Sequence, residues 1–220
     1  MIAAECVSAM HFNRTTLSWD RRSSDAAALC AELSAWRWTI EAGYDPPDEH
    51  DPARLVPHDG MSGAFALSLG SATAIGLSLG PALVDRLVDF GVVVAPLAGL
   101  ALHELIINAV IHGNLSVPSG RSDAWCDLGK RYHGIAEALA DPVRSARTLT
   151  IAVCWRAGAA IAVVADQGAG YDVTGETISR LGSGRGLRIA RTAGDVSIRC
   201  DGRQTAIVLE CLLPAPDGGP

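Results

Sequence analysis

Residues 103–114, His-Glu-Leu-Ile-Ile-Asn-Ala-Val-Ile-His-Gly-Asn, place a line of polar side chains on an otherwise apolar segment. Glu104, Asn108 and His112 are four residues apart, and at 3.6 residues per turn they share one face of a helix. A helix that is apolar on its other sides is expected to be buried. Because buried polar groups cost free energy without partners, this line indicates either a lined pocket or side chains that satisfy one another. The motif by itself favours neither reading.

A second segment ends an apolar strand pattern at Asp166 and continues with Gly168 and Gly170. Glycine lets the backbone approach a ligand closely, and an aspartate at a strand end can accept a hydrogen bond from a bound base. The same residue types are common where a strand ends in an ordinary turn. Taken alone, this segment favours the turn.

A third segment places three glycines, Gly182, Gly184 and Gly186, ahead of a short helical pattern. A glycine-rich loop that opens a helix offers free N–H groups and the positive end of the helix dipole to a phosphate. The spacing lacks the preceding strand and the G-x-G-x-x-G pattern of a Rossmann fingerprint, and the chain has no Walker A sequence. The alternative is a lid loop with no ligand.

In this order and spacing, the three segments resemble the GHKL superfamily of ATP-binding domains, which includes gyrase-type ATPases, histidine kinases and anti-sigma-factor serine kinases. The resemblance covers roughly residues 64–213, and the segment around the first motif is most similar to the anti-sigma serine kinases. The matching motifs are the N box, Glu104-x-x-x-Asn108, the first glycine box, Asp166-x-Gly168-x-Gly170, and the second, Gly182-x-Gly184-x-Gly186-Leu187.

The resemblance implies a role for each of these residues. Asp166 would accept a hydrogen bond from the adenine amino group, and Thr205 would help it through water. Asn108 would give its side-chain oxygen to Mg²⁺, and Glu104 would be the base for the attacking hydroxyl. The further nucleotide contacts that it implies are His112, Gly168, Gly170, Gly182, Gly184, Arg185, Gly186 and Leu187.

The resemblance therefore implies an ATP- and Mg²⁺-dependent protein serine/threonine kinase that binds a sigma factor and phosphorylates a protein antagonist. Two alternatives stay open. One is the ATP-binding domain of a histidine kinase phosphorelay, although His11, followed by Phe-Asn, matches a phosphoacceptor poorly. The other is a non-catalytic, nucleotide-gated module that holds a protein partner. A homodimer is expected from the resemblance.

Composition narrows the class of protein. A net charge of −6 argues against a nucleic-acid partner, which normally meets a basic face. No stretch has the length and apolarity of a membrane span, and the start of the chain does not read as a signal peptide. The six cysteines are scattered without a C-x-x-C pair, which indicates reduced thiols and a cytoplasmic protein.

The patterns predict an α+β two-layer sandwich, with helices on one face of a mixed, mostly antiparallel sheet. Residues 1–60 are expected to hold a helix at Ser24–Ala42 and a proline-rich linker at Tyr44–Asp59. Residues 61–213 are expected to form the ATPase domain, with an inserted, partly helical element at 114–148, and residues 214–220 a disordered tail. Within that domain the predicted helices are Pro81–Phe90 and Pro96–His112, and the predicted strands are Thr148–Trp155, Ala159–Ala165, Val196–Cys200 and Thr205–Leu212.

Overall fold

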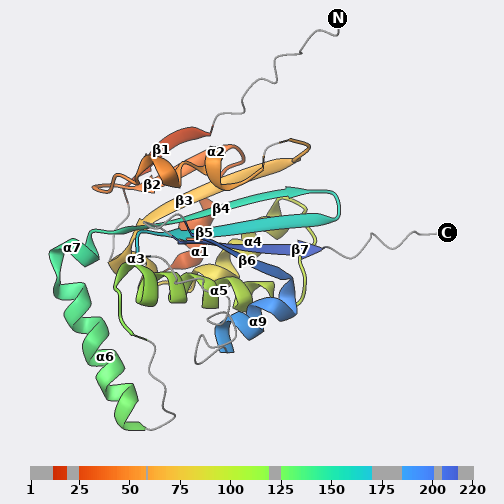
Figure 1. Ribbon diagram of the computed structural model, residues 1–220. Coiled ribbons are helices and arrows are strands. Elements are labelled where there is room, and N and C mark those ends of the chain that lie inside the picture. The colour runs from red at the N-terminus through yellow and green to blue at the C-terminus, as the bar shows by residue number, and fades with distance from the viewer. Residues whose placement is uncertain are drawn as a thin grey trace, which may run out of the picture.

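A single sheet forms the centre of the protein in the computed structural model, which describes residues 12–18, 25–57, 59–118, 125–169, 185–200 and 205–212. The described residues give it seven strands in the order β1-β2-β3-β4-β5-β7-β6 (Figure 1). The strands are β1 Asn13–Leu17, β2 Arg37–Glu41, β3 Gly63–Gly70, β4 Thr148–Arg156, β5 Ala159–Asp166, β6 Asp195–Cys200 and β7 Thr205–Leu212. The first three strands are parallel to one another, and every other neighbouring pair is antiparallel. The predicted mixed, mostly antiparallel sheet is therefore confirmed.

The longer helices of the sandwich lie below the sheet in the view of Figure 1. They and the short helices of this layer are α1 Ala26–Ala31, α3 Ser71–Ile75, α4 Leu79–Asp89, α5 Ala98–Asn108 and α9 Arg185–Ala193. α5 continues without a break into a π-helical segment, Ala109–Asn114. α6 Trp125–Ala140 and α7 Pro142–Ser145 lie at one side, where α6 projects away from the sheet.

Strand alternation explains how the core is divided between the two faces of the sheet. On β3, Phe65 and Leu67 belong to the large cluster between the sheet and the helices, whereas Ala64 and Ala66 belong to the cluster on the opposite face of the sheet. Successive side chains on a strand point to opposite faces, so both faces of β3 are buried. Small residues on the second face match its thin covering layer.

That layer is the segment between β2 and β3, which holds η1 Asp48–His50 and α2 Pro52–Leu55. Leu55 and Val56 pack there with Trp38 and Ile40 of β2. Tyr44–Asp59, predicted to be a linker, is instead a packed crossover between two parallel strands. Prolines at 46, 47 and 52 are compatible with it because they stand outside the helix interiors or at a helix start.

The helix expected at Ser24–Ala42 is also wrong over its second half. Among the described residues the helix ends at Ala31, and β2 begins at Arg37. Leu29 and Leu33 lie on the helix side of the sheet, whereas Trp38 and Ile40 follow the two-residue period of a strand toward the other side. Pairing with β1 and β3 on both edges decides the conformation here over local helical spacing.

The N-terminal strands are tied to the rest of the fold by a buried carboxylate. Glu41 of β2 accepts hydrogen bonds from the Gly70 N–H at 2.9 Å and from the Thr73 hydroxyl at 2.8 Å. β1 and β2 therefore belong to the same sheet as the later strands. A domain boundary near residue 60 stays a prediction.

Most elements of the later chain are confirmed. α4 and α5 match the predicted helices, and the predicted strand pairs form β4–β5 and β6–β7. α6 confirms that the inserted element expected at 114–148 is partly helical. The tail expected at 214–220 lies outside the described residues.

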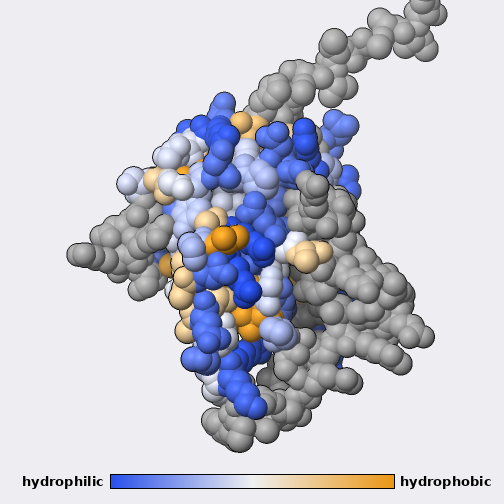
Figure 2. Space-filling view, turned by 60° about the vertical axis from the view of Figure 1, so that its left-hand side comes forward, coloured by the Kyte–Doolittle hydropathy of each residue, from blue (hydrophilic) through white to orange (hydrophobic). Residues whose placement is uncertain are grey.

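The surface of the molecule is more polar than the two apolar clusters of its core. The side of the molecule that carries α7 presents mainly hydrophilic residues, with small hydrophobic areas between them (Figure 2). In the part of the chain that the structure describes, no helix has the length and apolarity needed to cross a membrane.

Candidate functional site

Asp166 ends β5 with its side chain on the helix face and is 1% exposed. Its Oδ1 accepts a hydrogen bond from the Gly168 N–H at 2.8 Å, whereas Oδ2 is buried and has no partner among the described residues. Burial raises the pKa of Asp166 to about 7, against smaller opposing effects of the Gly168 bond and the Arg147 guanidinium. A buried oxygen without a donor is costly, so this carboxyl group suits a ligand that brings an N–H.

Two glycines form the walls around this carboxyl group. A Cβ on Gly113 would lie 2.3 Å from Cγ of Asp166, and a Cβ on Gly168 would lie 2.7 Å from Cα of Gly113. The end of the helical element and the end of β5 are therefore in backbone contact, through Gly113 on the helix and Gly168 just after the strand. Gly168 is one of the predicted nucleotide contacts, whereas Gly113 was not predicted, since a glycine after a helix usually marks only the end of that helix.

Glu104 and Asn108 lie on α5, the same continuous helical element that reaches Asp166 at Gly113. Both side chains are half-buried, and neither hydrogen-bonds to any other described residue. α9 packs on α5, with Ala190 and Ala193 buried. The predicted polar line is therefore present on a helix, and the ligand roles of its first two members stay predictions.

One ring nitrogen of His112 is hydrogen-bonded to the backbone close by in the chain. Its Nδ1 lies 2.6 Å from the Val117 carbonyl oxygen. Burial lowers the pKa of His112 below its ordinary value, which favours a neutral ring with Nδ1–H donating to that carbonyl. A nucleotide would therefore have to contact the other ring nitrogen, Nε2, and the predicted contact at His112 stays a prediction.

Thr205 is the backbone partner of Asp166 in the β5–β7 ladder. The two residues that the resemblance assigns to one adenine are thus directly opposite each other, although they are far apart in sequence. A helix does follow the second glycine box, because α9 begins at Arg185 and includes Gly186 and Leu187 in its first turn. Gly170, Gly182 and Gly184 lie outside the described residues.

Sequence reasoning missed Asn114, which is fully buried beside this site. Its carboxamide bonds Ser71, Thr148 and Gln167 at distances from 2.7 to 3.1 Å. The available signal was weak, since an asparagine after His-Gly reads equally well as a helix-end residue.

The residues fit a magnesium–nucleotide ligand in the limited way that the resemblance implies. Asn108 offers one carboxamide oxygen, and Mg²⁺ is often held by one or two protein oxygens together with phosphate oxygens and water. No group of three or more metal-binding side chains (His, Cys, Asp or Glu) occurs within the described parts of the chain. The unpartnered Asp166 Oδ2 is an acceptor of the kind that a base N–H would meet.

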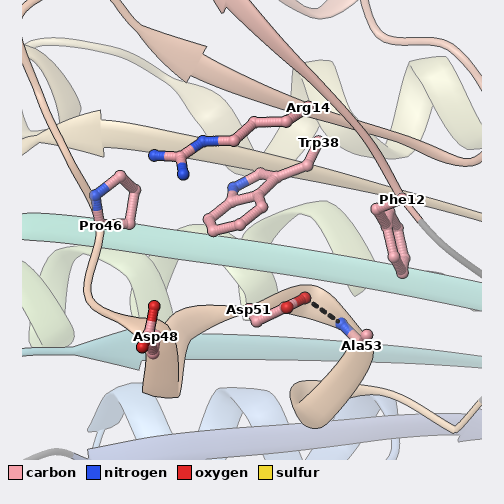
Figure 3. A pocket seen from close by; sticks show the side chains of 7 residues that line it. All are labelled: Phe12, Arg14, Trp38, Pro46, Asp48, Asp51 and Ala53. Carbon is pink, nitrogen blue, oxygen red and sulfur yellow. Dashed lines mark hydrogen bonds between the residues drawn. The ribbon is translucent and has the colours of Figure 1, made fainter.

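A separate cavity of about 240 Å³ opens between β1, β2 and the η1–α2 segment (Figure 3). Its lining residues are Phe12, Arg14, Trp38, Pro46, Asp48, Asp51 and Ala53. The Arg14 guanidinium lies over the Trp38 ring and is paired with Asp45, and one Asp51 oxygen caps the N–H of Ala53 at 2.9 Å. These groups largely satisfy one another, and we assign no ligand to this cavity.

Comparison with protein-family models and with curated proteins gave no match to this sequence. The inference of function therefore rests on the ordered motifs and on the arrangement around Asp166.

Proposed function

We propose that the protein is an ATP- and Mg²⁺-dependent protein serine/threonine kinase of the cytoplasm, similar to anti-sigma regulators. The observation that carries the proposal is the buried Asp166 carboxyl group, with an unpartnered Oδ2 between two glycines and directly opposite Thr205. Base recognition needs such a hydrogen-bond acceptor. The ordered N box and glycine boxes supply the remaining parts.

Each side chain of the site has a chemical task in this proposal. Asp166 accepts the adenine amino group, and Asn108 gives an oxygen to the Mg²⁺ that accompanies the phosphates. The resemblance assigns the phosphates to the backbone N–H groups of the second glycine box, residues 182–186. Bound Mg²⁺ supplies charge neutralisation on the phosphate oxygens.

Glu104 acts as the general base, one helical turn from Asn108. It takes the proton of a serine or threonine hydroxyl on the partner protein, whose oxygen forms a bond to the γ-phosphorus. The bond from that phosphorus to the bridging oxygen breaks, and ADP leaves with the electron pair. The natural partners of such a reaction are a sigma factor, which is bound, and an antagonist protein, which is phosphorylated.

Titration calorimetry tests the nucleotide site first. The wild-type protein is expected to bind ATP with an affinity that depends on Mg²⁺, and Asp166→Asn is expected to lose that binding. Asp85→Asn, which alters an exposed aspartate on α4, is the matched control and should bind as wild type does. Absence of saturable ATP binding to the wild type would refute the proposal.

Glu104→Gln separates a kinase from a nucleotide-gated binding module. The variant should bind ATP within about twofold of wild type but lose phosphoryl transfer, since a positioned base contributes roughly 10²–10⁴-fold to the rate. A coupled assay that follows the formation of ADP gives the rate. No turnover in either protein would instead favour the binding module, whereas equal turnover in both would show that Glu104 is not the base.

A further inference from the structure

Asn114 takes the place of a backbone partner at the point where β4 and β5 separate. The β4–β5 ladder pairs Thr150 with Ala165, and the same register would next pair Thr148 with Gln167. Instead, Asn114 Nδ2 donates to the Thr148 carbonyl oxygen at 3.1 Å, and its Oδ1 accepts from the Gln167 N–H at 2.7 Å. A carboxamide presents the same donor and acceptor as a peptide group, so it inserts between the two strands and continues their bonding.

The remaining bonds hold this inserted group from all sides. Its second Nδ2 hydrogen points to the Ser71 hydroxyl at 3.0 Å, and the Gln167 side-chain oxygen accepts the Thr148 N–H at 2.7 Å. The Arg147 guanidinium donates to the Asn114 carbonyl oxygen at 2.7 Å. Asn114 is fully buried, so water cannot reach its side chain. The protein groups around it supply the hydrogen bonds that water would otherwise make.

The π-helical turn is what allows two neighbouring residues to face the sheet. The Leu115 N–H bonds the Val110 carbonyl five residues back, at 2.8 Å. This wider turn places Gly113 against the Asp166 carboxyl group while Asn114 reaches Thr148 and Gln167. π-Helical turns inside α-helices are frequent at functional sites.

We propose that Asn114 is the positioning residue for base recognition by Asp166. Asn114 holds Gln167, which follows Asp166 in the chain, against the end of the helix. The same helix end contacts the Asp166 carboxyl group through Gly113. The inference rests on the proposed nucleotide function and goes beyond it, because it names the residue that gives the site its preference for adenine.

The test compares ATP with inosine triphosphate, which carries a carbonyl in place of the adenine amino group. Wild-type protein should prefer ATP. Asn114→Leu keeps the branched arrangement of heavy atoms but removes every side-chain bond, and should raise the Kd for ATP about tenfold while changing the Kd for inosine triphosphate less than about twofold. Ser116→Ala, in the exposed part of the same turn, should change neither value.

A purely structural role for Asn114 would weaken both nucleotides equally, and either that result or two unchanged Kd values would overturn the inference. If Asn114→Leu does not fold by circular dichroism, Gln167→Met decides. It removes only the bond to the Thr148 N–H and should reduce the preference by about two- to fivefold. A wild type that binds ATP no better than inosine triphosphate would instead refute base recognition by Asp166, and with it the proposed function.

Discussion

The Asp166 carboxyl group links ligand binding to the stability of the unliganded protein. Folding raises its pKa from 3.8 to about 7, chiefly through burial. Between these values the folded protein binds more protons than the unfolded chain, so the free energy of unfolding falls as pH rises. The contribution is greatest near and below pH 3.8 and is lost as pH passes 7.

We therefore expect Asp166→Asn to be more stable than wild type at pH 8, by about 1–3 kcal/mol, because it removes a buried charge with an unpartnered oxygen. The difference should shrink toward pH 4. Urea denaturation at both pH values measures it. A variant that is less stable at pH 8 would show that the carboxylate is satisfied in the folded protein.

Gly113 gives a second prediction at the residue scale. In Gly113→Ala the added Cβ would overlap the Asp166 carboxyl group, with 2.3 Å to both Cγ and Oδ1. ATP affinity should fall at least about tenfold, because the carboxyl group must move. Gly129→Ala on α6, where no atom lies within 4 Å of a new Cβ, is the matched control for calorimetry. Unchanged affinity in Gly113→Ala would place the base elsewhere.

At the scale of the elements, α4 and α5 cross in backbone contact. A Cβ on Gly80 would lie 2.2 Å from the Gly99 carbonyl oxygen and 2.4 Å from the His103 nitrogen. These are main-chain atoms, which cannot rotate away as a side chain does. The crossing therefore fixes how α5, with Glu104 and Asn108, sits in the helix layer.

Gly80→Ala should accordingly destabilise the protein by about 1–3 kcal/mol, as overpacking in a core typically does. Gly76→Ala is the control, since its Cβ would meet atoms at 3.7 and 3.9 Å, which is ordinary contact. Thermal unfolding followed by circular dichroism compares the two. Equal melting temperatures would mean that the helices separate without cost.

At the scale of the whole molecule, burial is uneven across the sheet. β3 is buried along its full length, and β4 along all but its last residue, whereas three of the five residues of the edge strand β1 are exposed. Amides open locally most easily where few apolar contacts are lost. Hydrogen exchange should thus be slowest in β3 and β4 and much faster in β1. Equal protection in β1 would indicate that its outer edge is covered.

The sequence predicted the parts of the molecule whose signals are local. Strand alternation and helix periodicity placed β4, β5, α4 and α5, and the spacing of Glu104 and Asn108 placed both on one helix. β2 was missed because its partners are distant in sequence, and pairing with β1 and β3 decided its conformation. Asn114 was missed for the same reason, since its role depends on Ser71, Thr148 and Gln167 meeting in space.

The place of β3 in the sheet has a consequence for the order of folding. β3 is synthesised early, but its antiparallel partner β4 follows only after α4, α5 and α6. Until β4 arrives, one edge of β3 has unpaired peptide groups and apolar side chains on both faces. Such long-range pairing is slow and leaves an aggregation-prone surface exposed in the meantime. A ribosome-bound chain that stops before residue 148 should therefore engage chaperones, whereas one that extends through β5 should release them.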